Sequence, residues 1–228
     1  MDVFNILASI GTLMAALATL LTVLQMNKQR KESYKPIATI IKKWYHIGYL
    51  YSTIPIVKEY KTYLDLETAK INNSLLIEII NAGAGTMIDL NWNFFTNIDD
   101  WKKILETDIN TEVYFKEKRL IIKGNKLSQD HNFDYQNIGK YSYLPSEPSY
   151  NSLEISLPSY LLTMLKMFYE MQNRNAKTEM PKVYLDLSYF DIGKKMYKKR
   201  IEIVNQLMMS GYNENNEIKT FDLEIYGK

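Results

Sequence analysis

Acidic and histidine side chains that could act together in catalysis gather in one short segment of this 228-residue chain. Asp130-His131-Asn132-Phe133-Asp134 places two carboxylates beside an imidazole, and these are side chains that bind divalent cations. His46 is the only other histidine in the sequence, so few residues are available to form a catalytic dyad or triad. The segment permits a metal-dependent hydrolase that uses His131 with Asp130 and Asp134. An ordinary polar loop explains the same residues without a metal.

The remaining motifs with chemical potential have simpler structural interpretations. The chain has no cysteine, which excludes disulfides, thiolate nucleophiles and thiolate zinc sites. Asp99-Asp100 is typical of the polar first turn of a helix. The glycines of Asn81-Ala82-Gly83-Ala84-Gly85 could turn the backbone toward a phosphate, but no P-loop lysine follows them. We therefore predict no cofactor, and we interpret this segment as a tight turn in a hairpin or at a bulge.

The densest charged run is basic and extends from Lys194 to Arg200, with Tyr197 inside it. A net charge of only +2, from 28 basic and 26 acidic residues, argues against nucleic-acid binding through bulk charge. The run could instead contact anionic lipid head groups, or protect the edge of a hairpin from aggregation. With the basic residues near position 30, the predicted lipid-facing set is Lys28, Arg30, Lys31, Lys35, Lys194, Lys195, Lys198 and Lys199.

An apolar N-terminal segment is the element that would bring those charges to a membrane. From Val3 to Asn27 there is no Asp, Glu, Lys or Arg. About 20 helical residues, rising about 1.5 Å each, cross a hydrocarbon core of about 30 Å. A buried core helix would show a polar stripe, and a cleaved signal peptide would carry positive charge before the apolar run. Neither feature is present, so the segment is predicted to be an uncleaved transmembrane anchor.

The charges around the segment predict its orientation. Basic residues follow it and none precedes it, and positive flanks stay in the cytoplasm. We therefore expect a single-pass protein of the cell membrane with its N-terminus outside and its C-terminal domain in the cytoplasm. Residues 1–35 form the anchor and basic juxtamembrane segment, and residues 36–228 form the domain.

Small residues recur along one face of this helix at spacings of three and four. Such a face lets transmembrane helices approach closely, although Ala, Gly and Thr are also common in membrane helices generally. The pattern predicts possible homo-oligomers formed through a helix-association face of Ala8, Gly11, Thr12, Ala15, Thr19 and Thr22.

The domain after Pro36 reads as mainly β, because short alternating runs are separated by Asn, Gly, Asp and Pro. Eighteen tyrosines fit this interpretation, since aromatic side chains suit a pleated surface. Between Gly124 and Pro148 the signal is weak and loops are expected. A short helix is predicted at 97–105 and an amphipathic helix that packs one face on the sheet at Ser159–Asn175. The predicted strands are 37–44, 74–81, 87–95, 112–115, 119–123, 153–157, 183–191, 198–207 and 220–226.

Three segments together resemble a known class of protein. They are Lys-Gln-Arg-Lys-Glu-Ser-Tyr-Lys-Pro after the anchor, Leu-Ile-Glu-Ile-Ile-Asn-Ala-Gly-Ala-Gly, and Tyr-Phe-Asp-Ile-Gly-Lys-Lys-Met-Tyr. The combination resembles uncharacterised bacterial single-pass membrane-anchored proteins with a small immunoglobulin-like β domain. The resemblance implies an Ig-like β-sandwich with one or two accessory helices, and it supplies no catalytic residues. The helix at Ser159–Asn175 is a departure from an ordinary sandwich.

These observations lead to three functional hypotheses. The first is a membrane-anchored binding or assembly module whose cytoplasmic domain engages a protein partner, without catalysis. The second is an oligomerising membrane effector in bacterial stress or phage defence, which depends on the small-residue face. The third is the metal-dependent hydrolase built on His131.

Overall fold

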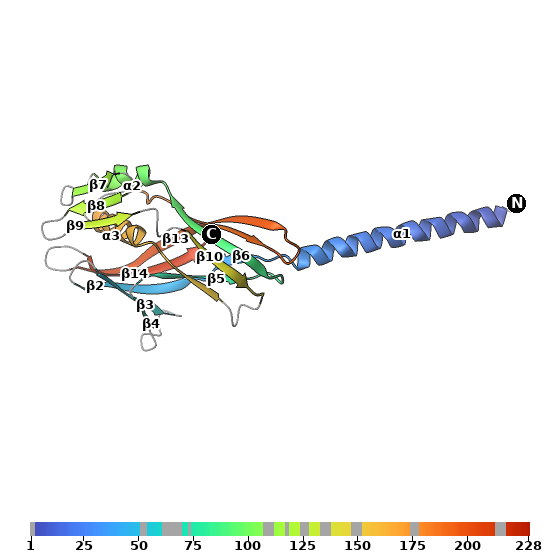
Figure 1. Ribbon diagram of the computed structural model, residues 1–228, viewed down its shortest axis with the longest axis horizontal. Coiled ribbons are helices and arrows are strands. Elements are labelled where there is room, and N and C mark those ends of the chain that lie inside the picture. The colour runs from blue at the N-terminus through green and yellow to red at the C-terminus, as the bar shows by residue number, and fades with distance from the viewer. Residues whose placement is uncertain are drawn as a thin grey trace.

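A long helix projects from one end of a mainly β domain in the computed structural model of the chain (Figure 1). The structure describes residues 3–50, 54–60, 70–72, 74–106, 112–116, 119–123, 128–132, 138–146, 152–173, 178–212 and 218–228. In these ranges the chain forms three helices and fourteen strands.

The first helix, α1, runs from Val3 to Ser33, and the part from Leu7 onward is long and apolar enough to cross a membrane. Its apolar side chains are exposed rather than packed on the domain. The hydroxyls of Thr12, Thr19 and Thr22 each donate a hydrogen bond to the carbonyl four residues earlier, at 2.8–2.9 Å. These three hydroxyls are thus satisfied within the helix, which is what a lipid environment requires of polar groups.

The strands form three antiparallel sheets. The first has the order β1-β5-β11, the second β10-β6-β12-β13-β14-β2-β3-β4, and the third β7-β8-β9. The first sheet contains β1 (Ala38–Ile40), β5 (Leu76–Asn81) and β11 (Ser152–Ser156). The third contains β7 (Glu112–Lys116), β8 (Arg119–Lys123) and β9 (Ser128–Asn132). The eight-stranded sheet contains β2 (Lys43–Leu50), β3 (Ile54–Tyr60), β4 (Lys70–Asn72), β6 (Met87–Thr96), β10 (Ile138–Leu144), β12 (Val183–Phe190), β13 (Met196–Tyr212) and β14 (Ile218–Gly227).

Alternating side chains from these strands build the core. In β12 the buried residues are every second one from Val183 to Tyr189, as the alternation predicts. In β6 the alternation breaks at Asp89, which has a φ of 50° and lies where the β12–β6 register shifts. This β-bulge adds one residue, so Met87 is buried whereas Ile88 is only partly buried.

The two domain helices differ in how closely they follow their sequence patterns. The helix α2 (Ile98–Leu105) begins as predicted, because the Asn97 side chain accepts a hydrogen bond from the Asp99 amide at 3.1 Å. The helix α3 (Ser159–Asn173) is buried on more than the one face that was predicted. Tyr169 donates to Asn205 of β13 at 2.7 Å, whereas Phe168 packs edge-on against Trp101 of α2. The helix therefore lies between the large sheet and α2 and is an internal layer of the domain.

Several predicted boundaries change in the structure. The single strand predicted at 37–44 is divided into β1 and β2, which belong to different sheets. The region 124–148, expected to be loops, contains β9 and β10. The glycine segment at 81–85 does not close a hairpin, since β5 and β6 lie in different sheets and the segment connects them. The strands β3 and β4 had no sequence prediction.

Candidate functional site at the junction of helix and domain

The segment that follows α1 passes against the 81–85 turn where it enters the domain. The side chain of Asn81 connects this segment to the turn. Asn81 is fully buried, and its Oδ1 accepts hydrogen bonds from the amides of Ile37 and Gly83, both at 3.1 Å. Its Nδ2 donates to the carbonyls of Gly85 at 2.5 Å and Leu144 at 3.4 Å. One amide side chain therefore holds the helix exit, the turn and the end of β10 together.

The two glycines of the turn are required by close approach rather than by backbone angle. No glycine in the described ranges has a positive φ. A Cβ at Gly83 would collide with the backbone of Lys35, and a Cβ at Gly85 would collide with the carbonyl of Tyr34. The predicted conformational role of these glycines is thus wrong, and their function is to let the helix exit pass against the turn.

The β12–β13 hairpin holds the helix exit from another direction. The Tyr189 hydroxyl donates to the carbonyl of Pro36 at 3.3 Å, and burial raises the pKa of Tyr189. The Lys199 ammonium donates to the carbonyl of Ala38 at 2.7 Å. Tyr197 stacks on Tyr189 with ring centroids 5.7 Å apart. The segment that follows α1 is therefore fixed to the domain by backbone, amide and aromatic contacts.

Two basic segments that are far apart in sequence lie together where α1 meets the domain: the residues near position 30 and the tip of the β12–β13 hairpin. The ammonium groups of Lys35 and Lys195 both lie over the ring of Tyr197, at 5.6 and 5.3 Å from its centroid. Lys194 is exposed at the tip of the same hairpin, and Figure 1 shows that hairpin reaching the end of the domain where α1 leaves. Lys28, Arg30 and Lys31 are exposed at the end of α1. The Lys199 ammonium differs from these because it bonds the Ala38 carbonyl.

A groove separates the end of α1 from the 81–85 turn. It has a volume of about 480 Å³ and is open to solvent along one side. Its lining combines one cation, one aromatic ring and small polar groups, and consists of Met26, Gln29, Arg30, Ser33, Tyr34 and Ala84.

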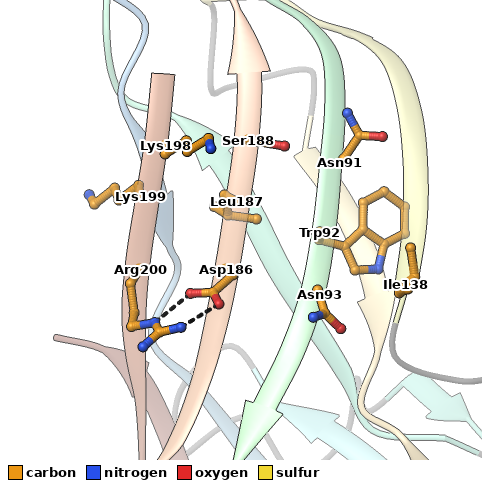
Figure 2. A pocket seen from close by; sticks show the side chains of 10 residues that line it. All are labelled: Asn91, Trp92, Asn93, Ile138, Asp186, Leu187, Ser188, Lys198, Lys199 and Arg200. Carbon is orange, nitrogen blue, oxygen red and sulfur yellow. Dashed lines mark hydrogen bonds and ion pairs between the residues drawn. The ribbon is translucent and has the colours of Figure 1, made fainter. Parts of the chain in front are cut away.

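A second depression, of about 440 Å³, lies on the outer face of the large sheet (Figure 2). Asp186 and Arg200 form a bidentate ion pair across β12 and β13, with both contacts at 2.6 Å. The Arg200 guanidinium also lies over Phe95 at 5.0 Å from the ring centroid. Lys198 lies beside Ser188 in the same depression (Figure 2), and no carboxylate pairs with it in the described part of the chain. Among the described residues of this depression, Lys198 is thus available to pair with an acidic group, whereas Arg200 is already neutralised by Asp186.

A buried ionic group joins the first and second sheets. Lys43 is 7% exposed and contacts the carboxylates of Glu59 and Glu78, the latter at 2.6 Å. Burial opposes the charge on Lys43, but the two carboxylates outweigh it, so its pKa is raised. Burial and the nearby glutamates raise the pKa of Tyr45 strongly, and its hydroxyl bonds the Leu76 carbonyl. These groups are engaged with one another, which indicates a structural role.

The predicted metal ligands lie only partly within the described residues. Asp130 and His131 belong to β9, whereas Asp134 lies outside the described residues. His46 pairs with Asp222 at 2.6 Å. Across the described ranges no three His, Asp or Glu side chains are grouped as metal ligands. The hydrolase hypothesis therefore stays a prediction.

Every residue of the predicted helix-association face is exposed on α1. A Cβ added at Gly11 would have no atom within 4 Å. The face is thus open along its length, and the sequence could identify it without the structure.

Sequence reasoning missed Asn81 and the groove because both depend on contacts between distant segments. Asn81 was recognised only as the first residue of a turn, and its bond to Ile37 spans 44 positions. Comparison with known proteins gives no relative from which a role could be transferred, since no protein-family model, curated protein or solved structure matches the chain.

Proposed function

We propose that this chain is a single-pass protein of the cell membrane whose β domain is a cytoplasmic binding or assembly module. The observation that supports the anchor is an exposed helix with no charged residue from Val3 to Asn27, followed by a short segment that is hydrogen-bonded to the domain. A helix with this composition gains free energy by leaving water for lipid.

The proposed orientation has the N-terminus outside and the domain inside. Lys28, Arg30 and Lys31 follow the apolar segment, and the fixed hairpin adds Lys194 and Lys195 at the same end. All five would lie beside the cytoplasmic leaflet, where anionic lipids attract each of them by about 1 kcal/mol. The same charges would resist transfer across the bilayer.

For the domain we propose an immunoglobulin-like sandwich with insertions. The order β1-β5-β11 corresponds to strands A, B and E of that fold, and β10-β6-β12-β13 corresponds to C′, C, F and G. On this assignment α2 and the third sheet are inserted between C and C′, whereas α3 lies between E and F. The β2-β3-β4 hairpins and β14 extend the second sheet. The strand order supports the assignment, because a chance arrangement would seldom reproduce both sheets.

The proposed protein-binding surface is the outer face of β10, β6, β12 and β13. It presents Ile138 at 69% exposure and Phe95 at 45% exposure around the depression that contains Lys198. Exposed apolar side chains with a few polar groups between them are typical of protein interfaces. We infer that a protein partner with an acidic group for Lys198 binds there.

Two experiments test this function. The first asks whether the full chain stays in the membrane pellet after carbonate extraction. Because the chain has no cysteine, single cysteines at Asp2 and Ser210 can then be labelled with an impermeant maleimide in intact cells. We expect labelling only at position 2. A soluble chain, or labelling at position 210, would refute the anchor or the orientation.

The second experiment places a photo-crosslinking residue at Ser188, in the proposed binding surface, and at Ser156 on the first sheet as a control. A discrete adduct at 188 that is lost with Lys198→Glu supports the surface. Adducts of equal yield at both positions would refute it.

A second candidate function is the oligomerising membrane effector. The observation that favours it is the open face around Gly11, which would let a second α1 approach closely. Cysteine crosslinking at Ala15 in native membranes tests it, with Leu17 as the control on another side of the helix. A chain that is monomeric in the membrane ends this hypothesis.

A further inference from the structure

The groove between α1 and the 81–85 turn lies directly after the part of the helix that would cross the bilayer. Met26, Gln29, Arg30 and Ser33 recur at i, i+3, i+4 and i+7, so they share one face of the helix. Ala84 of the turn lies across the groove from that face. The groove is therefore built from both the anchor and the domain, and its width depends on how the two are held together.

The depth of the groove relative to the bilayer follows from helix geometry. This depth rests on the proposed function, in which α1 spans the membrane. If the inner edge of the hydrocarbon lies at Met26, just before the first charged residue Lys28, about 20 residues at about 1.5 Å each reach back across a hydrocarbon core of about 30 Å. Arg30 is four residues further, or about 6 Å. A bilayer of about 40–45 Å leaves roughly 5–8 Å for each head-group layer. The Arg30 guanidinium thus lies at the level of the lipid phosphates.

The charge of the groove is positive and unneutralised. No carboxylate pairs with Arg30 among the described residues, and Glu32 lies about 200° around the helix from it. A guanidinium has a planar set of donors that binds a phosphate through two parallel hydrogen bonds. The amide of Gln29 and the hydroxyl of Ser33 are neighbouring donors, whereas Met26 offers an apolar surface at the hydrocarbon edge.

We propose that this groove binds the phosphate-containing head group of one anionic phospholipid from the cytoplasmic leaflet. Arg30 pairs with the phosphate, Gln29 and Ser33 bond the polar head group, and Met26 contacts the start of the acyl chains. The lipid fills the space between the end of α1 and Ala84 of the turn.

Native mass spectrometry of the full chain in mild detergent, titrated with phosphatidylglycerol, tests the site. Arg30→Gln and Lys31→Gln change the net charge equally, but Lys31 lies about 100° away around the helix, outside the groove lining. We expect Arg30→Gln to weaken lipid binding about tenfold, as loss of a charge-assisted pair predicts, and Lys31→Gln to change it less than about twofold. Ala84→Trp, which fills the groove at constant charge, should weaken binding as Arg30→Gln does.

Three outcomes would overturn the proposal. Equal losses for Arg30→Gln and Lys31→Gln would mean that charge attracts lipid without a site. Unchanged binding by folded Ala84→Trp, with its circular dichroism intact, would exclude the groove. Displacement of the lipid by inorganic phosphate at an equal concentration would mean that the ligand is a free anion. None of these results bears on carbonate extraction or maleimide labelling, so failure of the site is distinguishable from failure of the anchor.

Discussion

Replacing Asn81 by leucine tests whether one buried side chain connects the segment after α1 to the domain. Leucine has nearly the same volume, so the change removes hydrogen bonds with little change in packing. The amide of Gly83 and the carbonyl of Gly85 would each lose their partner in a buried position, and the amide of Ile37 would lose its partner in a part-buried one. At about 1–3 kcal/mol for each unpaired buried group, the expected loss of unfolding free energy is about 3–6 kcal/mol, allowing for partial relaxation.

Asn205→Leu is the matched control. Asn205 is also buried, at 8% exposure, but accepts one hydrogen bond, from the Tyr169 hydroxyl at 2.7 Å. Its replacement should cost about 1–2 kcal/mol. Urea unfolding of the full chain in detergent, followed by tryptophan fluorescence to which the buried Trp101 contributes, measures both variants. If Asn81→Leu costs no more than Asn205→Leu, the hydrogen bonds at the junction do not hold the helix exit and our reasoning is wrong.

The remaining predictions concern packing, charge and pH. Gly85→Ala should destabilise the domain by about 1–3 kcal/mol, because its Cβ collides with the Tyr34 carbonyl, whereas Gly48→Ala meets only an ordinary contact and should be neutral or stabilising in the same urea assay. Lys43→Met should cost about 3–5 kcal/mol at pH 7 by removing the cation that the mostly buried carboxylates of Glu59 and Glu78 share, and an effect below about 1 kcal/mol would mean that the ion group is solvated. Stability should fall above about pH 10, because groups with a raised pKa keep protons in the folded chain that the unfolded chain releases, at up to about 1.4 kcal/mol per pH unit for each group. Urea midpoints from pH 8 to 11 measure this loss, and a constant midpoint would contradict the ion pairing of Lys43 and the burial of Tyr45, Tyr169 and Tyr189.

The elements that local chemistry determines were predictable. The absence of charge from Val3 to Asn27 predicts α1, the Asn97 cap predicts α2, and the strict alternation from Val183 to Tyr189 predicts β12. The β10 strand was missed because it lies at the edge of the large sheet and is largely exposed, which removes the alternation that marks a half-buried strand. The β9 strand, Ser-Gln-Asp-His-Asn, has no apolar residue to indicate its pairing with β8.

The candidate site was less predictable because its parts meet only in three dimensions. The basic residues were recognised individually, yet the sequence gives no reason for Lys35 and Lys195 to share the ring of Tyr197. The predicted one-sided packing of α3 fails for a similar reason. The sequence of α3 shows which of its residues are apolar. It does not show that two different elements, with Trp101 of α2 and Asn205 of β13, pack against the helix from different sides.

The two proposals for α1 place different occupants on the same side of the helix. At about 100° per residue, Ala8, Thr12 and Thr22 fall within about 40° of the direction of Met26, so the helix-association face continues into the wall of the groove. A second helix packed on this face would meet the Ala84 turn at its C-terminal end, where a bound lipid would also lie. Pairing and lipid binding should therefore compete. The disulfide yield between single cysteines at Thr12 should fall when phosphatidylglycerol replaces part of the phosphatidylcholine in vesicles, and Arg30→Gln should abolish that fall. A yield that is constant or rises with the anionic lipid would show that the face and the groove are independent.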